Sequence, residues 1–184
     1  TTLFRSPEPG VLSMEYTKQE YPVYGTGDYR SPALSILQEN GSRIVNFTYV
    51  SHEIYQGKKS LSPLPAVYTN NEHEVCTLEI CLHDEVINTD LILSYTMFEE
   101  YPVITRNAKL VHKGEESIVL DRALSMSVEF QDMDFEMVHL SGAWARERYV
   151  KERKLEMGIQ AVQGIHGTAG GAEHNPFLAL KRPD

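Results

Sequence analysis

The segment Leu124-Ser-Met-Ser-Val-Glu-Phe130 carries the clearest pattern in the chain, because apolar and polar residues alternate along it. Successive side chains of a β-strand point to opposite faces, so this alternation predicts a half-buried strand. The buried face would hold Leu124, Met126, Val128 and Phe130. The same period of two recurs from about Pro32 onward and is the dominant pattern of the sequence.

Turn residues divide the chain into short β-prone runs on both sides of this segment. Asn40-Gly41 supplies the positive φ angles of a tight hairpin, which is expected to join residues 33–38 to 43–53. Lys113-Gly114 is expected to do the same between residues 103–112 and 117–130. The other strand candidates are residues 74–83, 90–98, 147–154, 158–162 and 177–181.

Helical patterns are nearly missing from the sequence. Residues 132–137 make one short turn at most, because their apolar positions form no stripe with a period of 3.6 residues. Many short strands with Gly, Pro and Asn between them are typical of an all-β fold, either an antiparallel sandwich or a barrel. We therefore predict a single β-sandwich domain over residues 1–184, with an irregular N-terminal segment at 1–31 and a Gly-rich loop at 163–176.

Composition narrows the class of partner. A net charge of -9 disfavours nucleic acid as a partner, and no apolar run is long enough to span a membrane.

Cys76 and Cys81 are the only cysteines and stand five residues apart, which points them to opposite faces of one strand. A disulfide is not expected, so the chain is predicted to work in a reducing compartment, most simply the cytoplasm.

The sequence lacks the motifs of several kinds of catalytic and cofactor-binding site. The seven histidines have no metal-ligand spacing, and the Gly-rich loop at 163–176 has neither the Lys of a P-loop nor a βαβ context. Ser141 is not in a nucleophile elbow, and sequence spacing singles out no pair of glycosidase carboxylates. We predict no catalytic residue, no metal and no cofactor in this chain.

Two groups of residues remain as candidates for substrate contact. The first is Tyr24, Asp28 and Arg30, and the second is Trp144, Arg146 and Arg148. Aromatic rings with bidentate polar side chains suit sugar recognition, but the same residue types also pin loops and strand edges.

Trp144 is the only tryptophan, and Gly142, Ala143 and Ala145 beside it leave room for something to approach. We expect its ring to bury on the order of 200 Å² against a sugar, a neighbouring subunit or the core.

Ordered motifs recur along the chain from about Phe4 to the C-terminus. They are Gln19-Glu-Tyr-Pro-Val-Tyr-Gly25, Asp28-Tyr-Arg-Ser-Pro-Ala33, Leu64-Pro-Ala-Val-Tyr68, Leu78-Glu-Ile80, Tyr101-Pro-Val-Ile-Thr-Arg106, Asp121-Arg-Ala-Leu-Ser-Met-Ser127, His139-Leu-Ser-Gly-Ala-Trp-Ala-Arg-Glu-Arg148 and His174-Asn-Pro-Phe177. Together these motifs resemble the N-terminal region of bacterial α-galactosidases of glycoside hydrolase family 36.

The resemblance implies an antiparallel β-supersandwich, similar in topology to galactose mutarotase, that precedes a catalytic (β/α)8 barrel. On this reading the chain is a fragment that lacks the family's first strands and the barrel. The family's reaction is retaining hydrolysis of terminal α-galactosyl groups from melibiose and raffinose. Its catalytic aspartates lie in the barrel, and the nucleophile sits in a Lys-Trp-Asp type motif, whereas the Trp here is followed by Ala145.

The resemblance implies that this chain is a non-catalytic domain of a parent enzyme that acts on α-galactosides. The domain would serve homo-oligomer assembly and shape the active-site entrance. In related enzymes the oligomer is commonly a tetramer. An alternative is a stand-alone carbohydrate-binding module with Trp144, Tyr24 and Asp28 lining a groove. A third is aldose epimerase activity with His139 and Glu147 as acid and base, which topology alone suggests.

Overall fold

The computed structural model describes residues 18–25, 28–61, 67–164 and 173–183. The chain divides into two compact units, residues 1–129 and 130–184, which are described separately. All strand pairs between the named strands are antiparallel, and the named helical element is the 3-10 helix η2 (Glu72–Glu74). The prediction of an all-β antiparallel fold with little helix is confirmed.

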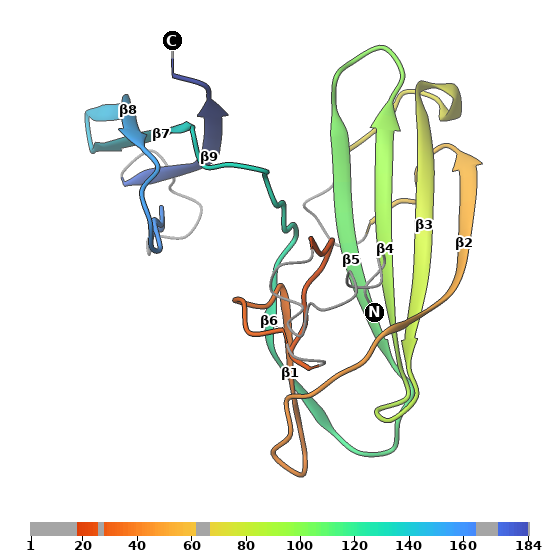
Figure 1. Ribbon diagram of the computed structural model, residues 1–184. Coiled ribbons are helices and arrows are strands. Elements are labelled where there is room, and N and C mark those ends of the chain that lie inside the picture. Colours follow the sequence, from red (N-terminus) through yellow and green to blue (C-terminus); the bar gives the residue numbers. More distant parts are fainter. Residues whose placement is uncertain (1–17, 26–27, 62–66, 165–172, 184) are drawn as a thin grey trace. The chain divides into compact units, whose positions relative to one another are not determined.

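The larger sheet of the first unit has four strands in the order β2-β3-β4-β5 (Figure 1). Consecutive strands are neighbours, so the sheet is a meander. The register between β3 and β4 runs unbroken from the pair Val75 and Phe98 to the pair Asp84 and Thr89. The bounds are β2 (Thr48–Gln56), β3 (Val75–Asp84), β4 (Thr89–Phe98) and β5 (Ile104–His112).

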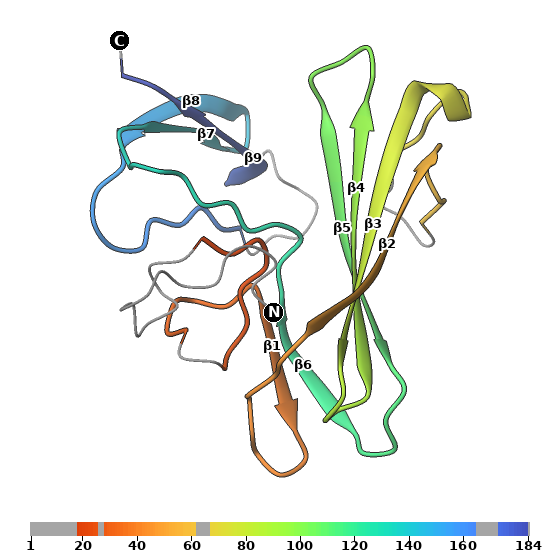
Figure 2. The ribbon, with the colours of Figure 1, turned by 45° about the vertical axis from the view of Figure 1, so that its right-hand side comes forward.

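A second, two-stranded sheet consists of β1 (Leu34–Gln38) and β6 (Ile118–Ala123) and lies beside the four-stranded sheet in Figures 1 and 2. Apolar side chains from both sheets form one core, so this unit is itself a small sandwich. Burying such side chains stabilises the fold by about 1.5–3 kcal/mol each. The buried cluster contains Tyr21, Ala33, Leu34, Ile36, Val45, Phe47, Leu82, Ile87, Leu91 and Leu93.

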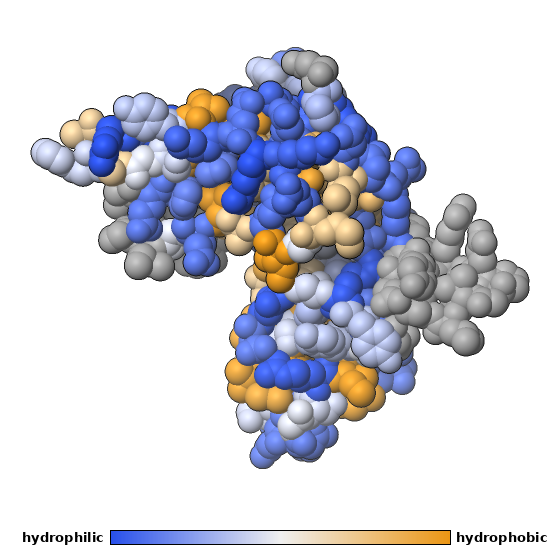
Figure 3. Space-filling view, turned by 60° about the vertical axis from the view of Figure 1, so that its left-hand side comes forward, coloured by the Kyte–Doolittle hydropathy of each residue, from blue (hydrophilic) through white to orange (hydrophobic). Residues whose placement is uncertain are grey.

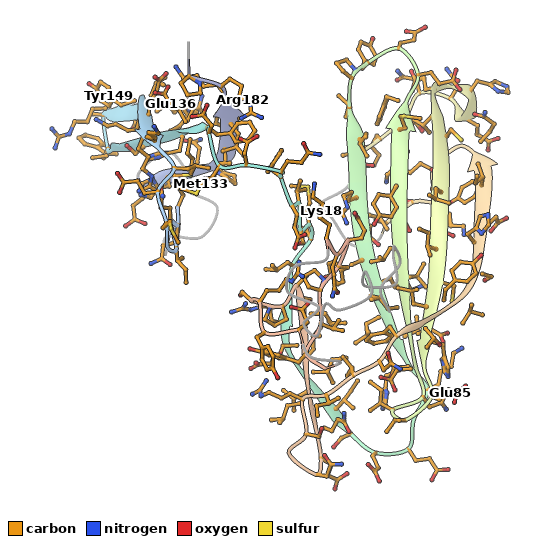
Figure 4. The ribbon with its side chains drawn as sticks, in the orientation of Figure 1. Lys18, Glu85, Met133, Glu136, Tyr149 and Arg182 are labelled. Carbon is orange, nitrogen blue, oxygen red and sulfur yellow. The ribbon has the colours of Figure 1, made fainter. Side chains whose placement is uncertain are left out.

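The second unit contains one three-stranded sheet in the order β8-β7-β9. Its strands are β7 (Glu136–Ala143), β8 (Arg146–Lys154) and β9 (His174–Lys181). Phe135 and Met137 are its buried apolar residues among those described, and the Arg182 guanidinium lies 3.9 Å from the Phe135 ring centroid. Glu136 and Tyr149 on this sheet, and Arg182 just beyond it, are labelled in Figure 4.

The strand predicted at residues 124–130 is wrong. Strand β6 ends at Ala123, and the following residues have no strand partner in the described part of the chain. The apolar side chains of this segment are 44–56% exposed. On its polar side, Ser127 and Glu129 are partly buried instead: Glu129 pairs with Arg30, and the Ser127 carbonyl accepts a hydrogen bond from Arg106. Alternation predicts two faces, but it does not say which of them the fold covers.

Both predicted hairpins contain a turn, but their strands pair elsewhere. At Asn40-Gly41 the chain does turn, with Gly41 at φ 83° and Gln38 N donating to Ser42 O at 2.9 Å. Residues 43–47 are not a strand, since β1 pairs with β6 and β2 pairs with β3. The strands that flank Lys113-Gly114 likewise belong to different sheets.

In the second unit, residues 158–162 form no strand, and β9 begins at His174, earlier than the predicted residue 177. Strand β7 covers Glu136–Ala143, a range in which no strand is predicted from the sequence. Residues 165–172 of the predicted Gly-rich loop and most of the 1–31 segment lie outside the described residues. The single domain over residues 1–184 stays a prediction.

Both cysteines are free, as expected from their separation on β3. No helix within the described ranges is long and apolar enough to cross a membrane. Exposed apolar side chains, orange in Figure 3, lie scattered among hydrophilic ones on the face shown.

Candidate functional site

Asp28 and Arg30 of the first predicted group belong to a partly buried ion-pair network in unit 1. Asp28 is 4% exposed, and its Oδ1 accepts hydrogen bonds from Arg30 N at 3.1 Å and from Arg30 Nε at 2.9 Å. Arg30 Nη1 also pairs with Glu129, whose other oxygen accepts from Gln19 N at 3.3 Å. One arginine therefore ties the N-terminal segment to the segment that follows β6.

The pKa of Arg30 shows how closely this group is engaged. Burial by itself would lower the pKa of the guanidinium, but hydrogen bonds to Asp28 and Glu129, together with their charges, raise it above its ordinary value. Charge-assisted hydrogen bonds of this kind orient side chains strongly. Tyr24 stands apart: its side chain is 37% exposed, and its backbone carbonyl accepts from Val45 N. Contact of these residues with substrate stays a prediction.

A second network, which the sequence analysis missed, connects the same N-terminal segment to the large sheet. Arg106 on β5 pairs with Glu20 at 2.5 Å and donates to Tyr95 Oη at 3.1 Å. Tyr95 in turn donates to Glu20 at 2.8 Å. Burial, followed by the hydrogen bond to Glu20, raises the pKa of Tyr95 to about 12. These contacts fix the segment that carries Asp28 and Arg30.

Trp144 lies at the turn between β7 and β8 and is 87% exposed. The expectation that its ring buries against the core is wrong, and a sugar or a neighbouring subunit remain as candidates to cover it. The turn is tight: Ala145 has φ 62°, and its N–H donates to Glu147 Oε1 at 2.8 Å. A Cβ on Gly142 would stand 2.5 Å from Arg146 O, so the backbone there approaches too closely for any side chain.

Arg146 and Arg148 are exposed residues of β8, and Arg148 has φ 62°. Of the two, Arg146 lines a cavity of about 730 Å³ on the three-stranded sheet. The proposed acid and base of an epimerase have other contacts, since Glu147 accepts the Ala145 N–H and the His139 ring contacts His174. No motif in the sequence indicates that His174 is the neighbour of His139.

A further cavity, of about 420 Å³, lies on the face of the four-stranded sheet that points away from the core. Its lining includes the Tyr55 ring, the Glu79 carboxylate and the Asn107 amide. Lys59 pairs with Glu79 and lies 4.9 Å from the centre of the Tyr55 ring. Sequence reasoning missed this site because its residues come from separate strands and share no local motif. Within the described ranges, no group of three or more metal-ligating side chains is placed to hold a metal ion.

Residues 2–184 match the family model "Glycosyl hydrolase family 36 N-terminal domain". The chain belongs to this family.

Relatives of this N-terminal domain are whole α-galactosidases. The chain is 45% identical over 177 residues to α-galactosidase AgaA of Geobacillus stearothermophilus, covering 95% of the chain and 24% of the relative. It is 38% identical to probable α-galactosidase C of Aspergillus terreus, covering 94% of the chain and 23% of that relative. The chain thus spans about a quarter of the length of these relatives.

Solved structures share the fold. The crystal structure of Geobacillus stearothermophilus AgaA matches 99% of this chain and 26% of its own, with a TM-score of 0.89 and 42% identity. A further AgaA structure, in complex with stachyose, matches 97% of this chain and 25% of its own, with a TM-score of 0.89 and 43% identity. The α-galactosidase of Lactobacillus brevis matches 93% of this chain and 23% of its own, with a TM-score of 0.87 and 34% identity.

Proposed function

We propose that this family 36 N-terminal domain is the non-catalytic part of an α-galactosidase that hydrolyses terminal α-galactosyl groups, and that it serves homo-oligomer assembly and shapes the active-site entrance. Two observations carry the proposal: residues 2–184 match the family's N-terminal domain, and the chain aligns with about a quarter of the length of a relative named α-galactosidase. A retaining glycosidase needs two carboxylates flanking the scissile bond. Asp28, Glu129 and Glu147 instead hold local structure.

Exposed apolar side chains support a role in assembly. Trp144 is 87% exposed, and Leu124, Met126 and Val128 are 44%, 56% and 52% exposed along one side of an unpaired segment. Apolar side chains exposed next to one another along one segment, as those of Leu124, Met126 and Val128 are, are typical of a protein–protein contact. The substrates of the parent enzyme are proposed to be α-galactosides such as raffinose and stachyose, which are the ligands in two AgaA complexes.

Sedimentation velocity of the 184-residue chain tests the assembly role. We expect concentration-dependent self-association that a Met126→Ser, Val128→Ser variant weakens, because the two serines remove the apolar contact area. A Val86→Ser variant is the matched control, since Val86 is 86% exposed in the turn between β3 and β4. A monomer at all concentrations, or equal weakening by both variants, refutes the assembly role.

The cytoplasm is the proposed compartment, and neither nucleic acid nor membrane is a proposed partner. Cys76 and Cys81 are unpaired on β3, and burial, followed by the nearby charge of Asp90, raises the pKa of the Cys81 thiol. A raised pKa lowers thiolate reactivity, which suits a structural cysteine in a reducing environment.

A stand-alone carbohydrate-binding module is the second candidate. The cavity on the four-stranded sheet favours it, because an aromatic ring, a carboxylate and an amide converge there in a volume within the range of small-molecule sites. Isothermal calorimetry with raffinose tests this function. Saturable binding that a Glu79→Gln variant abolishes supports it, and no heat of binding in the millimolar range refutes it.

A further inference from the structure

Unpartnered polar atoms gather on the three-stranded sheet of unit 2. His139 and His174 come from neighbouring strands, with ring centroids 5.4 Å apart. In both rings Nδ1 is buried and has no hydrogen-bond partner within the described residues. His139 is only 8% exposed, so its imidazole is more than nine-tenths buried. Buried polar atoms are nearly always paired, so an unsatisfied pair of imidazoles indicates a missing ligand or water.

The strand register brings other polar groups to the same face. His139 stands opposite Lys151 on β8, and Ser141 stands opposite Tyr149 on β8 and His174 on β9. Opposed residues of neighbouring strands share a face of the sheet. The cavity of about 730 Å³ opens here, and Arg146 and Gln163 also line it. Its lining contains one carboxylate, that of Glu173.

Positive charge on this face is unpaired, in contrast to the opposite face. Arg146 and Lys151 have no acidic partner among the residues that the structure describes. On the opposite face, Lys181 pairs with both Glu136 and Glu152, at 3.2 and 3.0 Å. The two faces are distinct because Glu136 and His139 are an odd number of positions apart on β7.

Arg153 adds to the positive field, although its Nη2 donates to Ala161 O at 3.0 Å. Burial lowers the pKa of His139, and the charges of Arg153, His174 and Lys151 lower it further. The positive charges around His139 therefore disfavour a proton on its ring, and a negative ligand on this face would offset those charges.

We propose that this face binds a small molecule through a phosphate or carboxylate group. Arg146 and Lys151 supply the charge, and the His174 imidazole with the Ser141 and Tyr149 hydroxyls supplies hydrogen bonds. Arginine and lysine are the side chains that proteins use most for such oxyanions. The cavity is larger than a single oxyanion needs, so the rest of the ligand has room beside Gln163 and Gly142.

Inorganic phosphate is the first probe, titrated into the 184-residue chain at constant ionic strength set with chloride. Amide chemical shifts of Ser141, Tyr149 and His174 report on the site, and the fluorescence of Trp144 at the adjoining turn gives a second signal. We expect saturable changes in both signals. Acetate and glucose 6-phosphate, run in parallel, distinguish a carboxylate ligand from a phosphorylated one.

Two charge-matched variants of one strand keep the test specific. Lys151→Gln is expected to weaken phosphate binding about ten-fold, the loss that follows removal of one charge-assisted hydrogen bond. Lys154→Gln, which lies opposite Glu136 on the other face, should leave binding unchanged. Equal weakening by both variants, no saturation below about 50 mM phosphate, or saturation by galactose but not by phosphate would overturn the proposal.

Discussion

Replacing Arg30 with methionine tests whether the Asp28–Arg30–Glu129 network holds the N-terminal segment in place. The variant keeps an unbranched apolar side chain but removes the guanidinium, and with it the side-chain hydrogen bonds to Asp28 and Glu129. Asp28, whose side chain is 1% exposed, keeps its charge and loses its cation. Removing one partner of a buried pair costs about 3–5 kcal/mol.

The side chains of Arg30 and Glu129 are 18% and 27% exposed, so solvent screening places the expected loss near the lower end, at about 3 kcal/mol. Urea unfolding followed by far-UV circular dichroism measures it. With a slope of about 2 kcal/mol per molar urea, the midpoint should fall by about 1.5 M.

Arg43→Met is the matched control, because Arg43 pairs with Asp121 at 2.6 Å while both side chains are 41–51% exposed. An exposed pair contributes less than about 1 kcal/mol. Adding Asp28→Asn to Arg30→Met should recover about 1–2 kcal/mol, since the uncompensated charge is removed. The reasoning is refuted if the Arg30 and Arg43 variants lose equal stability, or if the second substitution recovers nothing.

Four further outcomes follow from the same structure. Leu93→Ala leaves a cavity in the core of unit 1 and should lower the free energy of unfolding by about 3 kcal/mol in urea titrations; a loss below about 1 kcal/mol would contradict the core assignment. Gly142→Ala should destabilise unit 2 by about 1–3 kcal/mol, because the new Cβ would meet Arg146 O at 2.5 Å, whereas Gly164→Ala, whose Cβ would meet no atom closer than 3.5 Å, should cost less; both losses are read from Trp144 fluorescence in urea titrations. In an alkaline titration followed by tyrosine absorbance, one phenol should ionise near pH 12, later than the rest, and Tyr95→Phe should remove that step. Hydrogen bonds from Lys113 and then His83 hold the pKa of Asp90 below its ordinary value. Asp90 therefore contributes stability above about pH 4 that is lost as the pH falls through its folded pKa, and Asp90→Asn should flatten the acid limb of the curve of stability against pH. An unchanged acid limb would contradict this role.

Local pattern predicted most of the strands, β7 excepted, but not their partners. Residues 74–83 and 90–98 alternate and are joined by a short turn, so their pairing as β3 and β4 could be expected. The pairing of β1 with β6 joins residues far apart in sequence, and no local signal encodes it. The segment at 124–130 shows the same limit, since Glu129 and the Ser127 carbonyl find their partners in Arg30 and Arg106, which are distant in sequence.

The sequence predicted which residue types form the candidate sites, but not which residues contact one another there. The proximity of Asp28 and Arg30 follows from their spacing, but Glu129 joins them through the fold. His139 and His174 both stand in motifs that the sequence singled out, yet only the register of β7 and β9 shows that their rings meet. Trp144 was expected to pack, whereas a two-residue turn directs it away from the rest of its unit.

Hydrolysis of a nitrophenyl α-galactoside by the purified 184-residue chain tests the central claim most directly. No release of nitrophenol above the buffer blank is expected, even at high protein concentration, because the proposed role of this domain is non-catalytic and Asp28, Glu129 and Glu147 hold local structure. Turnover whose specific activity stays constant through successive chromatographic steps, and which therefore belongs to the chain and not to a contaminant, would contradict the claim.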